Sequence, residues 1–495
     1  MPHSFRSATP LSVPDPAAVA AGLDRLGRPP EWLLALEDPD RVLAELRANR
    51  APLGIDGTVL QGCKFKRADL AGGTWSTLHR LRVRDGDEAD VAEIDLRGRL
   101  RLPGQASERV PAQPPAPERW HGYLPGLRLQ VEGQPVDAAP LAPPGSDEHE
   151  PARLIEAALR ARGGRFSGLR LAGCRPRVMR YRPGLRCTIR YDLAYPPGAR
   201  PDEWPDAVIA KVYEEEGQAQ HTYTAMAALW RSPLGRSTTV TIAEPLAVDD
   251  EHRLLLQRLV PGDRTLKGEI DDAFAGGTRA GVAALSGVVR RVGRGLAELH
   301  GCGVDYGQEV TWASQIASVR ATAAQLTAAV PELSGAVDPL LAGLDLDAYG
   351  TRSAALVPTH RSFRPAQILL GGPHPAIVDF DGYCRAEPAL DLSVFRTTLC
   401  DLALRVIPRS GTASPTPAEL ATSMSPLDEL CATFLAGYEE IRPVDPARLA
   451  LWDALLGTKD ILDCWRKVKF EHLDRRMHFL RRRLDLGLIG LDSGA

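Results

Sequence analysis

The sequence has no CxxC pair and no Cys/His cluster, and its eight cysteines are spread from Cys63 to Cys464. This spacing argues against a disulfide framework and against a zinc site, and it is typical of a protein kept in a reducing compartment. No stretch approaches the roughly 20 apolar residues that span a membrane. The first residues also lack a basic segment followed by an apolar run. We therefore predict a cytoplasmic protein that does not act at a membrane.

The net charge is also small. With 60 Lys and Arg against 63 Asp and Glu, the formal charge is -3, so no global field favours nucleic acid as a partner. Apolar residues make up 44% and charged residues 25% of the chain, which is an ordinary balance for a globular protein. A length of 495 residues allows two or three structural units.

Proline is concentrated in one region, residues 103–150. Its density opposes continuous helix or central strand, so we predict a linker there around a short ordered piece, Trp120 to Val136. An N-terminal unit, residues 1–102, precedes it, with a helix predicted from Pro30 to Asn49 and strands from Cys63 to Leu100. The residues of this unit leave open whether it shapes an acceptor pocket or binds a protein partner.

The rest of the chain changes from strand patterns to helix patterns. Residues 151–262 contain a predicted hairpin, Arg177 to Leu193, turning at Pro183-Gly184, and later a strand from Ala207 to Tyr213. Residues 263–495 are mainly helical in pattern. Apolar residues recur there at the three and four spacing of a buried helix stripe from Leu285 to Leu299, and Asp463 to Leu484 is predicted as one long basic helix. A small antiparallel sheet followed by a helical half predicts an α+β protein with two lobes and an N-terminal α+β extension.

Two charged residues occupy apolar strands in ways that suit a cleft. Lys211 is a lone cation in the strand AVIAKVY, as expected if it reaches an anion in a cleft; the alternative is a lysine that extends to water. Asp379 ends the apolar strand AIVDF and precedes a glycine turn, which suits a metal-binding carboxylate. The alternative for Asp379 is a strand-end residue that caps a turn.

The segment from Thr359 to Phe395 resembles the catalytic region of the aminoglycoside phosphotransferase/choline kinase-like family, which has the protein kinase-like fold. The family pattern is a loop, HGDxxxxN, followed by a strand ending in DF. His360 matches the loop histidine, Gln367 the loop asparagine and Asp379 the metal-binding aspartate. Ser362 stands where the pattern has its catalytic aspartate. The resemblance covers roughly residues 150–485.

The resemblance implies an ATP and Mg²⁺ site between the lobes. The strand from Arg253 to Leu259, with Gln257 and Leu259 near its end, would lead to the segment that receives adenine. The metal would be held by Asp379 and Gln367, while Asp381 is either a further ligand or a turn former. The residues implied to contact the nucleotide phosphates are Lys211, Arg182, Gly184 and Arg186.

The same resemblance implies that His360 and Asp391 brace the loop, although Asp391 could equally cap the next helix. Ser362 and the neighbouring Arg364 would line the acceptor. No carboxylate occurs between Gln218 and Trp230, where the usual acidic partner of the lysine is expected. The N-terminal extension is also similar to that of bacterial sugar kinases of the same superfamily, such as maltokinases.

Serine at position 362 leaves two functions open. General-base assistance typically contributes about 10² to 10⁴ in rate, but phosphoryl transfer depends mainly on positioning and electrostatics. A chain that keeps its lysine and metal residues could therefore be a slow or altered phosphotransferase acting on a hydroxyl of a small molecule or peptide. The alternative is an inactive pseudokinase that serves as a nucleotide-binding or scaffold subunit of a biosynthetic complex.

Overall fold

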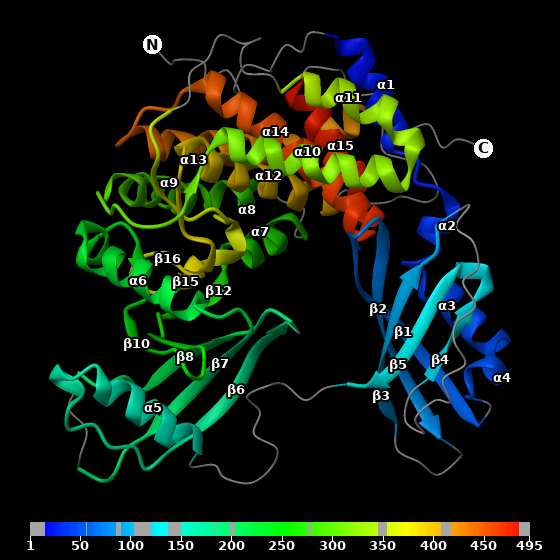
Figure 1. Ribbon diagram of the computed structural model, residues 1–495. Helices are drawn as coiled ribbons and strands as arrows, with labels where there is room; N and C mark the ends of the chain where they lie inside the picture. Colours follow the sequence, from blue (N-terminus) through cyan, green and yellow to red (C-terminus); the bar gives the residue numbers. More distant parts are fainter. Residues whose placement is uncertain are drawn as a thin grey trace.

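Three parts make up the protein in the computed structural model, an N-terminal unit, a small sheet lobe and a helical lobe (Figure 1). The structure describes residues 15–55, 57–85, 91–102, 120–136, 150–182, 184–198, 203–275, 279–344, 354–406 and 417–484. Pro183, the first residue of the predicted hairpin turn, lies outside these ranges.

The N-terminal unit is built on an antiparallel sheet of five strands in the order β1-β2-β3-β5-β4. Gly72 and Gly73, with φ of 58° and 75°, make the tight turn between the first two strands. The ordered piece within the Pro-rich region supplies the last two strands of this sheet. The strands are β1 (Thr58–Ala71), β2 (Thr74–Asp85), β3 (Ala92–Leu100), β4 (Trp120–Leu124) and β5 (Leu129–Pro135).

Among the described residues before this sheet, four helices are present: α1 (Pro16–Leu26), α2 (Glu31–Leu34), α3 (Pro39–Ala48) and α4 (Arg50–Leu53). The single helix predicted from Pro30 to Asn49 is therefore two helices. Asp38 separates them because its carboxylate caps the start of α3, accepting from the backbone N–H of Asp40 at 3.0 Å.

The small lobe is a five-stranded antiparallel sheet in the order β10-β11-β8-β7-β6. The predicted hairpin is confirmed as its β6-β7 pair, and the predicted strand from Ala207 to Tyr213 is β8. Helix α5 packs on one face of this sheet, and its residues form a buried cluster with residues of the strands. Helix α6 packs against β10 and β11. The elements are α5 (Glu150–Ala161), β6 (Gly173–Arg182), β7 (Arg186–Ala194), β8 (Ala207–Tyr213), α6 (Gln218–Arg231), β10 (Pro245–Asp249) and β11 (Leu254–Arg258).

The helical lobe contains most of the remaining chain. The predicted stripe of apolar residues between 285 and 299 is confirmed as the buried side of α9, where Val289, Val292, Leu296 and Leu299 are fully buried. The helices are α7 (Leu266–Ala275), α8 (Arg279–Ala284), α9 (Ser286–Gly301), α10 (Trp312–Ala329), α11 (Ser334–Ala342), α12 (Pro388–Val406), α13 (Pro417–Glu439), α14 (Pro446–Lys467) and α15 (Leu473–Arg483).

Two small sheets and several short 3₁₀ turns frame the loops of the helical lobe. One sheet has the order β12-β15-β16-β9 and the other β13-β17-β14. The strands are β9 (Thr241–Ile242), β12 (Gly262–Thr265), β13 (Glu309–Val310), β14 (Val357–Thr359), β15 (Ile368–Gly371), β16 (Ala376–Ile377) and β17 (Cys384–Ala386). The 3₁₀ turns are η1 (Pro125–Leu127), η2 (Gly164–Phe166), η3 (Pro233–Arg236), η4 (Pro331–Leu333), η6 (Pro365–Gln367), η7 (Phe380–Gly382) and η8 (Phe470–His472).

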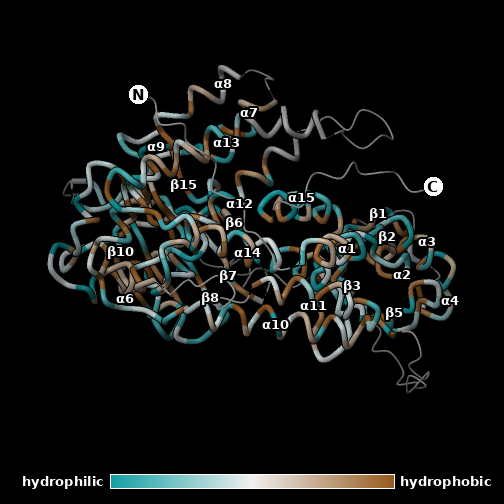
Figure 2. The backbone as a smooth tube through the Cα atoms, turned by 90° about the horizontal axis from the view of Figure 1, so that it is seen from above, coloured by the Kyte–Doolittle hydropathy of each residue, from teal (hydrophilic) through white to brown (hydrophobic). Residues whose placement is uncertain are grey.

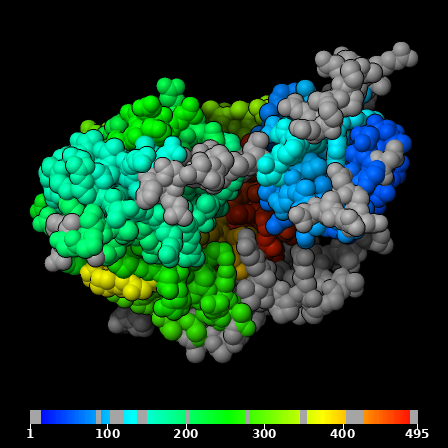
Figure 3. All heavy atoms as spheres, turned by 90° about the horizontal axis from the view of Figure 1, so that it is seen from below, coloured from blue at the N-terminus to red at the C-terminus, as the bar shows by residue number. Residues whose placement is uncertain are grey.

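The N-terminal unit shares its hydrophobic core with the helical lobe. The indole N–H of the fully buried Trp75 lies 3.2 Å from the carbonyl oxygen of Trp465, and the indole of Trp465 donates to the carbonyl of Leu26 at 3.0 Å. Residues of the N-terminal sheet and of α10, α11 and α14 belong to one buried cluster. From above, these helices lie between the small lobe and the N-terminal unit (Figure 2). From below, residues near the C-terminal end, in dark red, are visible between the green small lobe and the blue and cyan N-terminal unit (Figure 3).

The prediction of a single basic helix from Asp463 to Leu484 is wrong. The chain there forms the end of α14 and the whole of α15, separated at Val468, whose φ is 49°. The break is capped because the N–H of Lys469 donates to the carbonyl of Cys464 at 2.9 Å. Val468 and Phe470 are buried at this corner, against the core that Trp465 enters, so tertiary packing outweighs the local helical pattern.

These elements confirm an α+β protein with a small antiparallel sheet lobe, a mainly helical lobe and an N-terminal α+β extension. In the described part of the chain, no helix combines the length and the apolar character needed to cross a bilayer.

A carboxylate in the N-terminal unit makes stability depend on pH. Burial raises the pKa of Glu37 to about 7, although the backbone N–H of Phe470 partly offsets this. Because the folded pKa is raised, the stabilising contribution of the protonated form is complete below the unfolded value and is lost as pH rises through about 7. Glu37→Gln removes this titration. We therefore expect the substitution to raise the free energy of unfolding by about 1 kcal/mol more at pH 8 than at pH 5, a value reduced for solvent screening.

Urea unfolding at the two pH values measures this difference, with Glu31→Gln as the matched exposed control. An equal effect of Glu37→Gln at pH 5 and pH 8 would contradict it.

Candidate active site

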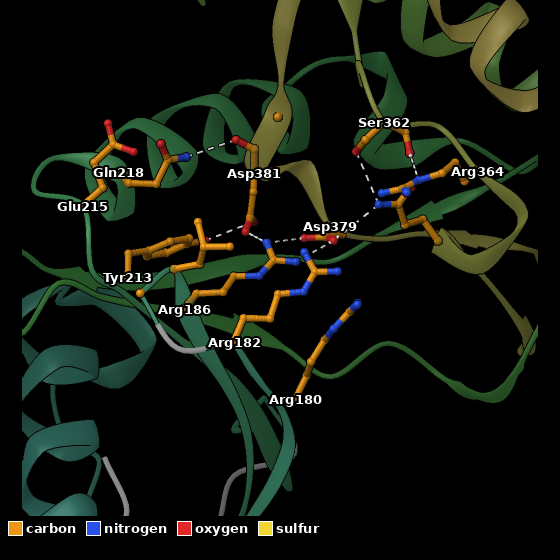
Figure 4. A pocket seen from close by; sticks show the side chains of 14 residues that line it. Arg180, Arg182, Arg186, Tyr213, Glu215, Gln218, Ser362, Arg364, Asp379 and Asp381 are labelled. Carbon is orange, nitrogen blue, oxygen red and sulfur yellow. Dashed lines mark hydrogen bonds and ion pairs between the residues drawn. The ribbon is translucent and has the colours of Figure 1, made fainter. Parts of the chain in front are cut away.

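The loop that follows β14 borders a pocket between the two lobes. The pocket has a volume of about 350 Å³, and Figure 4 shows arginines from the sheet lobe facing the loop that carries Ser362. Carboxylates and arginines dominate its wall. The lining residues are Arg180, Arg182, Gly184, Leu185, Arg186, Tyr213, Glu215, Gln218, Ser362, Arg364, Gln367, Asp379, Asp381 and Gly382.

Lys211 and Asp379, which lie 168 residues apart in the chain, are in direct contact. The Lys211 Nζ atom lies 2.7 Å from Asp379 Oδ1 and 2.5 Å from Asp381 Oδ1. Arg186 donates to both oxygens of Asp379 at 2.9 Å, a bidentate pair, and also reaches Asp381. Two carboxylates from the helical lobe are therefore neutralised by two cations from the sheet lobe.

This network sets the protonation states of its members. Burial lowers the pKa of Lys211 to about 8, against the opposing effect of the Asp379 charge. Burial alone would raise the pKa of Asp379, but the charges and hydrogen bonds of Lys211 and Arg186 outweigh it and hold that pKa well below its usual range. Asp379 is therefore an ionised carboxylate at neutral pH.

Asp379 also has an unusual backbone. Its φ of 75° and ψ of 56° lie in the left-handed region, which is uncommon for a residue with a side chain. The conformation turns the chain between Val378 and η7, so that the carboxylates of Asp379 and Asp381 contact the same Lys211 nitrogen. Local backbone strain is thus accepted where two charged side chains are brought together.

The donor set around Asp379 fits a magnesium ion in its chemistry. Asp379 and Asp381 supply carboxylate oxygens, and the buried Oε1 of Gln367 has no hydrogen-bond partner among the described residues. Mg²⁺ typically uses one or two carboxylates and completes its shell with phosphate oxygens and water. Arg186 and Lys211 already bind these carboxylates, so an ion would compete with them.

The loop serine is held by two neighbours. Ser362 Oγ lies 3.3 Å from His360 Nδ1 and 3.3 Å from the amide nitrogen of Gln367. His360 Nε2 lies 3.1 Å from the carbonyl oxygen of Val378. Because that carbonyl can only accept, Nε2 carries the proton and Nδ1 accepts from the serine hydroxyl. No side-chain carboxylate bonds to Ser362 within the described part of the chain.

His360 and Asp391 support this loop from behind. Both are fully buried, and the backbone N–H of His360 donates to Asp391 Oδ2 at 2.7 Å. The same oxygen lies 3.3 Å from Nε2 of the buried His300. Asp391 lies in the first turn of α12, so its carboxylate ties the loop to two helices of the lobe.

Helix α6 supplies an amide instead of a carboxylate. Gln218, in its first turn, donates to the carbonyl oxygen of Asp381 at 3.0 Å. Lys211 is paired only with Asp379 and Asp381 among the described residues. The sequence indicated that the usual glutamate partner of the lysine is missing from this helix. In the described part of the chain, no glutamate pairs with Lys211.

The structure brings together most of the predicted site residues but leaves two apart. Gln257, at the end of β11, is buried beside Ile209 of β8, and Leu259 follows that strand half-buried. Neither lines the pocket.

Six residues that the sequence analysis did not assign to the site also line the pocket: Arg180, Leu185, Tyr213, Glu215, Gln218 and Gly382. The phenol of Tyr213 donates to Asp381 Oδ1 at 3.0 Å. Its position could have been predicted, because residues two apart in a strand share a face and Tyr213 follows Lys211 by two.

Comparisons with known proteins give structural matches only. No protein-family model and no curated protein matches the chain. A glucosamine kinase solved with glucosamine, ADP and inorganic phosphate is similar at 17% identity and a TM-score of 0.45, over 92% of this chain and 99% of that one.

Two further matches are a choline kinase from Cryptosporidium parvum and an ADP-bound aminoglycoside phosphotransferase. The choline kinase matches at 10% identity and a TM-score of 0.43, over 68% of this chain and 96% of that one. The aminoglycoside phosphotransferase matches at 13% identity and a TM-score of 0.42, over 67% and 99%. At these TM-scores the likenesses carry no argument about the site.

Proposed function

We propose that this protein is an ATP- and Mg²⁺-dependent phosphotransferase of the cytoplasm that acts on a hydroxyl group of a small molecule or peptide. The single observation that carries the proposal is the contact of Lys211 with Asp379 at the wall of a pocket between the lobes. Phosphoryl transfer from a nucleoside triphosphate needs a cation that binds the phosphates and a carboxylate that binds the metal ion, both in one site.

The residues around that contact divide into three groups. Lys211 and Arg186, with Gly184 at the hairpin turn, would bind the nucleotide phosphates. Ser362 and Arg364 would line the acceptor. Asp379, Asp381 and Gln367 would hold the magnesium ion, which supplies charge neutralisation on the triphosphate when bound. Because Lys211 now touches Asp379 directly, nucleotide binding requires the two side chains to separate, as lobe opening allows.

A pseudokinase is the second candidate. The observation that favours it is the environment of Ser362, whose hydroxyl donates to His360 and accepts from Gln367 without a carboxylate among its described neighbours. Such a site could bind nucleotide and position nothing for proton removal. In that role the protein would act as a subunit of a biosynthetic complex, with the N-terminal unit as its partner surface.

Isothermal titration of the full chain with ATP in the presence of MgCl₂ tests the proposal, followed by measurement of ADP release with a panel of hydroxyl acceptors. We expect Mg-ATP to bind, and Lys211→Ala to weaken binding by about tenfold to a hundredfold, since it removes a charged contact. Lys66→Ala, an exposed lysine of β1, is the matched control.

Absence of both binding heat and thermal stabilisation by ATP would contradict the proposal, and would favour a protein of the same fold that binds no nucleotide. Binding without turnover would favour the pseudokinase.

A further inference from the structure

Three arginines of the pocket lack an acidic partner. Arg186 is occupied by Asp379 and Asp381, whereas Arg180, Arg182 and Arg364 have no carboxylate within 4.0 Å in the described part of the chain. Among the described residues, the side chain of Arg364 makes one hydrogen bond, to the carbonyl oxygen of Ser362 at 3.4 Å. All three are exposed on the pocket side. They are therefore free to bind an anion.

A β-bulge places the two sheet arginines in the pocket. Along β6, Val178 pairs with Ile189, but Arg180 pairs with Thr188, so Met179 is the extra residue. The bulge reverses the alternation of side chains, and Arg180 and Arg182 come to lie opposite Thr188 and Arg186. Thr188 in turn pairs with Lys211, so these arginines share the face that carries the lysine.

Positive charges are gathered on this side of the pocket. Burial and the charges of Arg180 and Arg186 lower the pKa of Arg182. Burial lowers the pKa of Arg364, Asp379 opposes this, and the charge of Arg182 lowers it further, so these arginines from different lobes lie within electrostatic reach of each other. With Lys211, five cations face three carboxylates around one pocket. Like charges held together in this way are stabilised when an anion bridges them.

We propose that Arg182 and Arg364, assisted by Arg180, bind an anionic group, phosphate or carboxylate, that belongs to the acceptor. This inference deepens the proposed function and rests on it, because it specifies the chemical class of the acceptor. Figure 4 shows Arg180 and Arg182 rising from the sheet toward the side of the pocket where Ser362 and Arg364 lie. Arg186 and Lys211 are already paired with the carboxylates of Asp379 and Asp381.

Guanidinium chemistry limits what the acceptor can be. Arginine presents a planar fork of donors that matches carboxylate and phosphate oxygens, and it repels cations. A hydroxyl compound with a phosphate or carboxylate group therefore suits this side of the pocket, whereas an amine-rich acceptor does not.

The test uses inorganic phosphate as the probe. The full chain is first saturated with a non-hydrolysable ATP analogue and Mg²⁺, then titrated with phosphate, and separately with acetate at equal ionic strength. We expect phosphate, acetate or both to bind in the presence of the nucleotide analogue. Arg364→Gln should weaken this binding by about tenfold to a hundredfold, while Arg236→Gln, an exposed arginine of η3, leaves it unchanged.

The two anions distinguish the sources of the group, because preference for phosphate indicates a phosphorylated acceptor and preference for acetate a carboxylic acid. Anion binding that the nucleotide analogue abolishes would overturn the inference and leave the proposed function standing, since the arginines would then serve the triphosphate. Anion binding that Arg364→Gln does not weaken would also overturn it. If the nucleotide analogue itself fails to bind, the proposed function fails. Titration of the free protein with phosphate then still measures anion binding by the arginines.

Discussion

Replacing Ser362 with aspartate is expected to raise the rate of phosphoryl transfer by about 10² to 10⁴, the range that general-base assistance contributes. The side chain at this position lines the pocket, and His360 and Gln367 already hold it from behind. A carboxylate there could accept the proton of the acceptor hydroxyl, and Arg364 beside it would favour the ionised form. Turnover of the wild-type and variant proteins with the same acceptor measures the change.

Ser362→Asn is the matched control, because asparagine has the same shape as aspartate and cannot take up a proton. Equal rates for the two variants would show that position 362 does not act through a base. If Ser362→Asp binds Mg-ATP as wild type does and still gives no turnover with any acceptor, the pseudokinase becomes the better description.

Asp379→Asn is expected to lower both Mn²⁺ affinity and turnover, each by roughly 10² to 10³, because it removes the carboxylate at the centre of the network. Arg186→Gln is expected to raise the affinity for Mn²⁺, and no increase in turnover is expected from it. It frees both carboxylates from the guanidinium that now contacts them, and should raise that affinity by about tenfold or more. Titration of Mn²⁺ followed by electron paramagnetic resonance measures both changes.

Asp192→Asn is the control for this pair, since Asp192 lies on β7, pairs with Arg190 and is outside the pocket. It should leave Mn²⁺ affinity unchanged. Unchanged affinity in both Asp379→Asn and Arg186→Gln would exclude this donor set as the metal site.

Local patterns were sufficient to predict strands of the sheet lobe and one helix of the helical lobe. Strand alternation and a glycine turn predicted the β6-β7 hairpin, and the three-and-four spacing of apolar residues predicted α9. These signals are local because the period of the side chains reports which face of an element is buried. The motif around His360, Gln367 and Asp379 likewise predicted residues that the structure places within one loop system.

The same local signals failed where a distant part of the chain decided the conformation. Nothing in the helical pattern after Asp463 indicates the break at Val468, which depends on packing at a core formed with the N-terminal unit. The position of Arg180 was hidden by the bulge at Met179, because a single extra residue reverses the alternation on which strand predictions depend.

The sequence by itself determined the order of the elements, the chemical character of the loop at Ser362 and the two charged residues expected at a cleft. Only the tertiary structure decided that Lys211 and Arg186 share Asp379 and Asp381, and that Arg182 and Arg364 approach each other unpaired from different lobes. Spacing along the chain reports local conformation, whereas ion pairing depends on distances across the lobes that only packing establishes.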